Sequence, residues 1–161
     1  MRQPSLTFIG KENVSSQLLM DKAIIEFIKK QTCANVCLND ENGNPYCFTC
    51  YYSFDENEKL LYFKTSDDSN HSHFMKKNRI VAGTILPDKS KTGEVRGLQF
   101  RGEILELNHN FSKGASAHYH LRFPFALAMK GDVFTIRLSD AKLTDSRLGF
   151  GKKVIWERGT I

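Results

Sequence analysis

Hydroxyl, amide and imidazole side chains gather just after an expected strand, and they are the residues in this sequence best suited to bind a ligand. The strand is expected over residues 59–64 and a short helix over residues 69–77. The polar side chains between them and at the start of the helix are Thr65, Ser66, Ser69, Asn70, His71 and Ser72. Donors of this kind, at the carboxyl end of a strand where a helix begins, are what a phosphate group needs from a protein. The spacing therefore predicts a site for a phosphate-bearing ligand.

The signatures of common catalytic and metal sites are missing from the sequence. It has no GxSxG nucleophile elbow and no HExxH pair. His118 and His120 are two residues apart in an expected helix, where their side chains would point about 200° apart and could not easily hold one ion. His71 and His73 fail the same test. We therefore expect no metal site, and the catalytic residues, if any exist, stay unknown.

Four cysteines lie within 18 residues, a density that raises the question of a zinc site. They are Cys33, Cys37, Cys47 and Cys50. The Asn42-Gly43 pair is a strong turn signal, and a hairpin centred on it pairs Cys37 with Phe48. Because side chains alternate between the two faces of a strand, Cys47 would then face away from the other three thiols. We therefore expect no zinc, and buried free thiols in a reducing cytoplasm.

The length and composition fit one soluble domain. The chain has 161 residues, of which 40% are hydrophobic and 25% are charged, and this length suffices for a real core. No apolar run is long enough to span a membrane, and the first residues show no signal peptide. We expect a loose arm over residues 1–14, a single domain over residues 15–161, and a cytoplasmic location without a membrane partner.

The net charge of +5 comes from 23 Lys and Arg residues against 18 Asp and Glu residues. A nucleic-acid-binding domain often has such an excess, but it usually gathers the basic residues on one face. Here they are spread along the chain, and the densest group is Lys76, Lys77 and Arg79. We therefore expect no nucleic-acid partner. Nucleic-acid binding is kept as a hypothesis that a steep salt dependence of affinity would support.

The elements that must position the polar cluster are mostly short strands. An amphipathic helix, capped by Ser15 or Ser16, is expected to run to about Gln31. A second helical stretch is expected over residues 111–129, broken at Pro124. The expected strands cover residues 33–38, 46–54, 59–64, 79–86, 94–107, 133–138 (or as far as 143) and 152–158. Strands joined mostly by short turns predict a small closed β-barrel with helices beside it.

Two glycines and one tryptophan carry further expectations. Gly97 and Gly102 indicate bends or bulges within the long expected strand 94–107. Trp156 is the single tryptophan and lies on the last expected strand. One interpretation makes it an aromatic of the core or of a dimer interface, and the other makes it a wall for a flat heteroaromatic ligand.

The order of these elements resembles the pyridoxamine phosphate oxidase-like, flavin-binding split-barrel family. The resemblance covers about residues 15–158: a helix, a hairpin, a strand, a phosphate loop with its helix, and then the strands KNRIVAGTI and RGLQFRGEI. The segments VAGTI, RGLQFRGEI and LTDSRLGFGKKVIWERG are similar to a small bacterial branch of that family. The resemblance implies a mainly β fold, a six-stranded antiparallel split β-barrel with flanking helices.

The resemblance also implies a cofactor, FMN, bound non-covalently at the interface of a homodimer. The cofactor-binding residues that it implies are Phe48, Thr49, Cys50, Lys64, Thr65, Ser66, Ser69, Asn70, His71, Gln99, Lys152 and Trp156. The first three would line the isoalloxazine ring, residues 64–66 the ribityl chain, and residues 69–71 the phosphate. Gln99 would reach in from the next long strand, and the last two would come from the partner subunit.

One departure from the family pattern concerns the phosphate loop. Relatives commonly carry Arg and Lys where Asn70 and His71 stand here, and a neutral amide and imidazole hold a dianion less well than two fixed cations. Lys64 and Arg96 are expected to compensate.

The function implied is that of an FMN-binding protein, a flavin-dependent oxidoreductase of unknown substrate. The alternative is a non-enzymatic flavin- or haem-binding split-barrel protein of the stress type.

Overall fold

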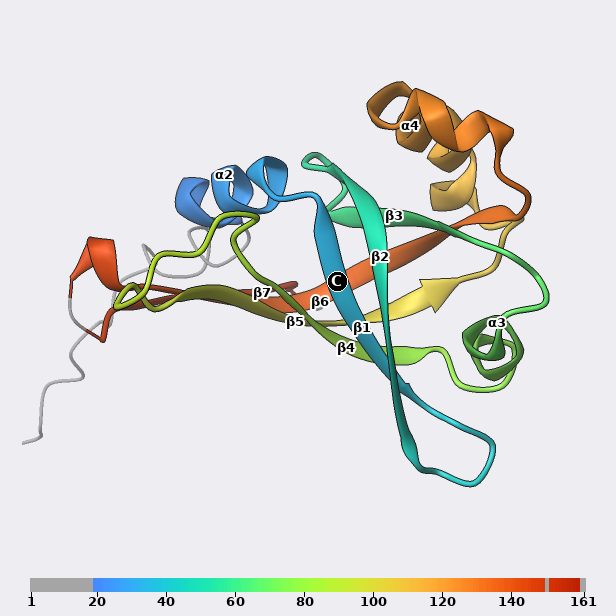
Figure 1. The fold of residues 1–161 in the computed structure, drawn as a ribbon, viewed down its shortest axis with the longest axis horizontal. Helices are drawn as coiled ribbons and strands as arrows, with labels where there is room; N and C mark the ends of the chain where they lie inside the picture. Colours follow the sequence, from blue (N-terminus) through green and yellow to red (C-terminus); the bar gives the residue numbers. More distant parts are fainter. Residues whose placement is uncertain (1–18, 150, 160–161) are drawn as a thin grey trace, which may run out of the picture.

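Six antiparallel strands form a closed barrel at the centre of the computed structural model, which describes residues 19–149 and 151–159 (Figure 1). The strands are β1 (Cys33–Asn39), β2 (Pro45–Asp55), β3 (Leu60–Thr65), β4 (Ile80–Ile85), β5 (Arg96–Leu105) and β6 (Asp132–Asp145). They follow the order β3-β2-β1-β4-β5-β6, and β3 also pairs with β6. That last pairing closes the ring, so the mainly β, six-stranded antiparallel barrel with flanking helices is confirmed.

The strand β6 has 14 residues and extends past the end of its pairing with β3. Its first half pairs with β3 from Asp132–Thr65 to Arg137–Leu60. Its second half pairs with β7 (Lys153–Glu157), while β5 pairs with both halves. The strands β5, β6 and β7 therefore continue beyond the barrel as an extension, seen to the left in Figure 1.

Glycine at two positions allows the strands to pack closely. At Gly102 the register between β5 and β6 shifts, and an added Cβ there would lie 2.6 Å from the carbonyl oxygen of Arg137. The bulge predicted at Gly102 is therefore confirmed, whereas Gly97 pairs regularly with Thr144. At Gly83 an added Cβ would collide with the ring of Phe100 and with the backbone of β1.

One row of inward-facing residues runs across six strands and forms much of the core. In the order β2-β1-β4-β5-β6-β7 it consists of Phe48, Val36, Gly83, Phe100, Ala141 and Trp156. The predicted inner face of β5 is confirmed, because Leu98, Phe100 and Ile104 are all buried. The same alternation leaves the odd-numbered residues of β1 and β2 on the outer surface of the barrel.

One helix that covers the core of the barrel is α2 (Lys22–Lys30), at the start of the described residues. The helix α2 buries Ile24, Phe27 and Ile28, and its N-cap is Asp21, whose Oδ1 accepts a hydrogen bond of 2.7 Å from the amide of Ala23. The helix thus begins later than predicted, and the proposed caps at residues 15 and 16 lie outside the described residues. Among the described residues, no helix has the length and apolar character needed to cross a membrane.

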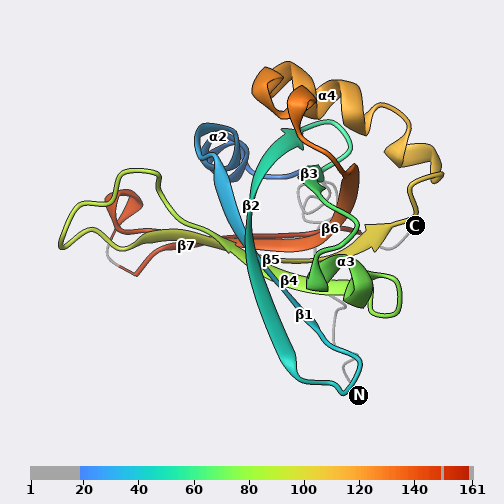
Figure 2. The same ribbon diagram turned by 45° about the vertical axis from the view of Figure 1, so that its right-hand side comes forward.

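The predicted helical stretch 111–129 is divided into three pieces. They are η1 (Asn110–Ser112), α4 (Ala115–Arg122) and η2 (Pro124–Ala128). The α4 helix ends just before Phe123 because the residue preceding a proline is disfavoured in a helix. Ala115 and Tyr119 of α4 pack with Leu60 and Tyr62 on the outer face of β3, and both views place α4 there (Figures 1 and 2).

The β1–β2 hairpin has a register one residue away from the predicted one. Asn39 pairs with Pro45, so the loop holds five residues instead of being a tight turn at Asn42-Gly43. The cause is Asp40, whose Oδ1 accepts hydrogen bonds of 2.8 Å from the amides of Asn42 and Asn44. A one-residue shift moves every side chain of a strand to the other face.

The shift changes the pairing of the cysteines. Cys37 stands opposite Cys47, with a Cα–Cα distance of 4.2 Å, and the two form a disulfide. The expectation of free thiols is therefore wrong for this pair. It holds for Cys33 and Cys50. The error came from the loop length, which the turn signal in the sequence did not reveal.

Candidate functional site

The junction between β3 and α3 (Asn70–Met75) brings three of the predicted polar residues together. The Oγ1 atom of Thr65 lies 2.5 Å from Nε2 of His71 and 3.2 Å from Oγ of Ser69. Ser69 is the N-cap of α3, and its Oγ accepts a hydrogen bond of 3.2 Å from the amide of Ser72. We call Thr65, Ser66, Ser69, His71 and Ser72 the rim cluster.

The hydroxyl groups of the rim cluster are paired with one another and with their own backbone. The carbonyl oxygen of Ser66 accepts hydrogen bonds from Oγ of Ser69 at 3.0 Å and from Oγ of Ser72 at 2.6 Å. Oγ of Ser66 donates to the carboxylate of Asp68. Asn70 is exposed beside this network. Hydroxyl groups that bond to each other can rotate toward a ligand, so the cluster keeps its capacity to bind one.

An aromatic ring supports the imidazole of the rim cluster. Phe48 of β2 stacks on His71 with 3.9 Å between ring centroids and 8° between the planes. Burial lowers the pKa of His71, so the ring is neutral at neutral pH. The hydrogen bond from Ser66 lowers the pKa of Asp68, which is ionised next to it. The cluster therefore offers neutral donors, and a negative charge lies nearby.

Two cations that were expected to compensate lie elsewhere. Nζ of Lys64 donates a 2.8 Å hydrogen bond to the carbonyl of Ala126 and lies 3.2 Å from Nε2 of His120, on the face of β3 opposite Thr65. Arg96 forms an ion pair with Asp145 in the extension, with 3.0 Å between Nε and Oδ2. Within its own chain, Arg96 is paired with a buried carboxylate at the end of β6 opposite to the one that pairs with Thr65, and compensation by Arg96 stays a prediction.

The outer face of the sheet carries a second group of polar residues in register. One row consists of Thr49, Asn35, Thr84, Gln99, Lys142 and Ile155. The next row consists of Cys47, Cys37, Ala82, Arg101, Asp140 and Glu157. A groove of about 520 Å³ lies over these rows from β1 through β4, β5 and β6 to β7 and is lined by Gln99 and Cys37 among others. We call it the outer groove.

The predicted site residues thus fall into separate groups. Phe48 joins the rim cluster, whereas Thr49 faces outward and its Oγ1 donates a 2.7 Å hydrogen bond to Oδ1 of Asn35. Cys50 packs against the core, and burial raises the pKa of its thiol to about 12. Gln99 lies in the outer groove, and Lys152 is exposed just before β7.

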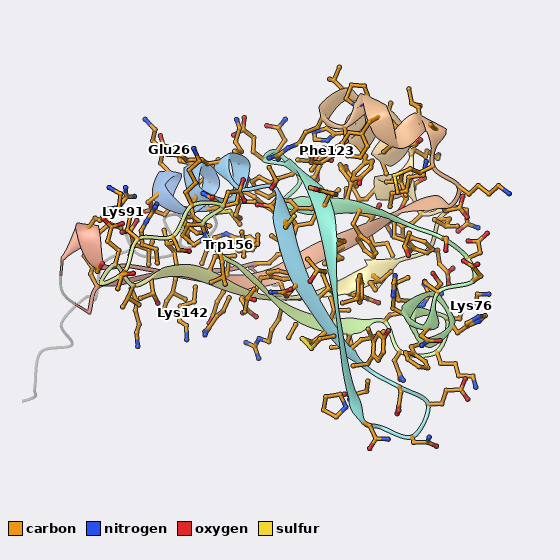
Figure 3. All side chains as sticks on the ribbon, viewed as in Figure 1. Glu26, Lys76, Lys91, Phe123, Lys142 and Trp156 are labelled. Atoms are coloured by element: carbon orange, nitrogen blue, oxygen red, sulfur yellow. A yellow bond between two sulfur atoms is a disulfide. The ribbon has the colours of Figure 1, made fainter. Side chains whose placement is uncertain are left out.

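Trp156 is buried in the core of its own chain, as in the first of the two interpretations. It is only 4% exposed, and its indole nitrogen has no hydrogen-bond partner among the described residues. Figure 3 shows it on the face of the extension that α2 covers, whereas Lys142 points away from the opposite face. Contact between Trp156 and a cofactor of the partner subunit stays a prediction.

Sequence reasoning missed three members of the outer groove, namely Lys142, Asp140 and the disulfide. Arg101 could be found, because it shares a face with Gln99 two residues earlier on β5. Asp140 pairs with it across the strands, with 2.7 Å between Oδ2 and Nε of Arg101. No local sequence pattern reveals which residue of β6 stands opposite a given residue of β5. The sequence therefore could not predict that Lys142 lies beside Gln99.

Comparisons with known proteins give the family. No family model matches the chain. The UPF0306 protein plu4501 of Photorhabdus laumondii is 33% identical over 135 residues, which are 84% of this chain and 94% of that protein. The UPF0306 protein YhbP of Escherichia coli is 36% identical over 138 residues, 86% of this chain and 93% of that protein. The chain belongs to the UPF0306 family.

Solved structures share the fold of this UPF0306 chain at low sequence identity. A haem-binding protein from Mycobacterium smegmatis aligns with a TM-score of 0.70 at 11% identity, covering 87% of this chain and 60% of that one. A pyridoxamine 5'-phosphate oxidase-related, FMN-binding protein from Nostoc punctiforme aligns with a TM-score of 0.62 at 11% identity, covering 85% and 89%. The UPF0306 chain therefore has the split-barrel fold of pyridoxamine phosphate oxidase-like proteins, a fold found with more than one cofactor.

Proposed function

We propose that this UPF0306 chain binds FMN non-covalently, as a homodimer. The observation that carries the proposal is the rim cluster, where Thr65, Ser69 and His71 meet at the end of β3 beside the ring of Phe48. Hydroxyl groups and an imidazole next to an aromatic ring suit a ligand with a phosphate at one end and a flat ring system at the other. The FMN-binding neighbour with the same fold supports the choice of ligand.

The residues of the rim cluster fit a phosphate that is held by neutral donors. The network has no fixed cation, and Asp68 adds negative charge beside it. Neutral hydrogen bonds are about half as strong as charge-assisted ones. We therefore expect modest affinity for FMN and a weak dependence of that affinity on salt.

Bound FMN would supply the redox chemistry, and the protein residues would bind and orient it. We propose an FMN-dependent oxidoreductase, without naming the substrate or the electron donor.

Exposed apolar side chains support the homodimer. The patch on β2 and around η2 consists of Tyr51, Phe125, Leu127 and Met129, all between 48% and 69% exposed. The rings of Tyr51 and Phe125 lie edge to face with 5.9 Å between their centroids, and exposed apolar surface of this kind marks sites of protein association. The side chain of Lys64 is bound to the carbonyl of Ala126 in the same segment, so a partner seated on the patch would lie next to a predicted cofactor residue.

Haem binding is the second candidate, and the haem-binding neighbour from Mycobacterium smegmatis favours it. Haem iron needs an axial ligand such as a histidine. His120 is already engaged through both ring nitrogens, with Lys64 and with Ser116, so it is a poor candidate for that ligand. The visible spectrum separates the two cofactors, because bound haem gives a Soret band and bound FMN gives flavin bands.

A fluorescence titration of cofactor-free protein with FMN tests the proposal. Replacing Ser69 and His71 together by Ala removes two donors, and we expect the Kd for FMN to rise at least tenfold. His73→Ala is the matched control, because His73 is exposed on the same helix. Asn70→Arg adds a cation at the first helical residue and should tighten binding. Unchanged affinity in the double variant would remove the rim cluster from the site.

A further inference from the structure

The Cys37–Cys47 disulfide lies on the outer surface of the barrel, away from the core. Cys47 is exposed and Cys37 is half-buried. Both belong to the outer row that continues through Ala82 to Arg101, and Cys37 lines the outer groove. A reagent in solution can therefore reach one sulfur of the bond directly.

The hairpin that carries the disulfide is held together by other interactions. Its backbone ladder runs from the Cys33–Tyr51 pair to the Asn39–Pro45 pair. Its loop is closed by Asp40, which also accepts a hydrogen bond of 3.2 Å from the side-chain amide of Asn44. Opening the disulfide would therefore leave the hairpin folded.

The remaining two thiols differ from this pair. Cys50 faces the core next to Ala34, and burial keeps its thiol protonated because it raises the pKa. Cys33 is a free, half-buried thiol that faces outward beside Tyr51. Among the described residues, neither Cys33 nor Cys50 forms a disulfide. Within the described part of the chain, an intramolecular disulfide is therefore confined to the Cys37–Cys47 pair.

We propose that Cys37 and Cys47 form a thiol–disulfide exchange site that takes low-molecular-weight thiols and opens without unfolding of the barrel. A thiolate from solution attacks Sγ of Cys47, the Sγ–Sγ bond breaks, and Cys37 leaves as a thiolate that takes up a proton. A second external thiolate attacks the mixed disulfide, forms an external disulfide and releases Cys47 as a thiolate, which is then protonated. Two external thiols are oxidised, and the protein gains two electrons and two protons.

Glutathione and mass spectrometry of the full native chain test this proposal. Treatment with oxidised glutathione should produce the Cys37–Cys47 bond, and reduced glutathione should open it in native buffer. Alkylation after native reduction should then label Cys37 and Cys47, while Cys50 is labelled only after denaturation. Cys33→Ser is the matched control and should leave the exchange unchanged.

Single variants locate the attacked sulfur. With oxidised glutathione, Cys37→Ser should accumulate a mixed disulfide on Cys47. Cys47→Ser should form the adduct on Cys37 at least about tenfold more slowly, because access is restricted there. Circular dichroism of both variants checks that the fold is kept. The proposal is overturned if oxidation forms no Cys37–Cys47 bond, if the bond opens only in denaturant, or if the two variants react at equal rates.

Discussion

His71 shows how one residue can be placed correctly by sequence and still differ in its chemistry. Its position after β3 could be predicted from the pattern of polar residues behind a strand. Its stacking on Phe48 could not, because the two residues are 23 positions apart and meet only through the barrel. The stack and the contact with Thr65 hold the ring in place, and burial holds it neutral. Its role at the rim cluster is therefore that of a neutral donor or acceptor.

Gly83 carries the sharpest prediction at the scale of one residue. Gly83→Ala would push a methyl group into the ring of Phe100 and the backbone of β1, neither of which can yield easily in a closed barrel. We expect a loss of about 1–3 kcal/mol in the free energy of unfolding, measured by urea denaturation. Gly114→Ala is the control for steric contact, since an added Cβ there meets no atom within 4 Å, and its only expected cost is the poorer N-cap of α4, of about 0.5–1 kcal/mol. Equal stability of the two variants would contradict the close packing seen at Gly83.

At the level of the elements, the sequence predicted which segments form strands and in what order they occur. It did not predict the register in which the strands pair. Short apolar runs separated by turn residues predicted the seven strands of the described residues, with errors at their ends. The β1–β2 register was missed because the side chain of Asp40 enlarges the loop, and a turn signal does not state how many residues the loop holds. The outer groove depends on register across five strands, so its composition stayed hidden.

The extension provides a prediction about pH, because it is held by a buried carboxylate. Asp145 is 3% exposed, and hydrogen bonds first from Arg147 and then from Arg96 lower its pKa to about 2. A carboxyl whose pKa is lowered by folding stabilises the protein above its unfolded pKa, and this contribution disappears as pH falls through the folded pKa. Wild type should therefore lose on the order of 1–2 kcal/mol between about pH 4 and pH 2.

The Asp145→Asn variant isolates this contribution. It should be less stable than wild type at pH 7, and the difference should shrink as the pH falls from about 4 to 2 and below. Urea denaturation at several pH values measures both stabilities. Asp140→Asn on the same strand is the control, because the Arg101 side chain that pairs with Asp140 is 71% exposed. A stability difference that stays constant with pH would show that Asp145 acts by packing alone.

The whole molecule was predictable to the level of a split barrel, because the order of its elements resembles a known family. The number of chains in the assembly is tested by measuring the mass of the protein in solution. We expect light scattering to give twice the mass of one chain, since the apolar patch of Tyr51, Phe125, Leu127 and Met129 needs a cover. Leu127→Glu should shift the protein toward monomer and weaken FMN binding. Leu19→Glu, on an exposed residue before α2, should change neither. A monomeric wild type would remove the dimer from the proposed function.

The pairing of β3 with β6 has a consequence for synthesis of the chain. Each closing contact joins a residue between 60 and 65 to one between 132 and 137, so the ring cannot form until the second segment exists. On the ribosome the earlier strands must wait, with the edge of β3 open, until β6 has emerged from the exit tunnel. A nascent chain arrested before residue 132 is therefore the form in which this protein should most need a chaperone.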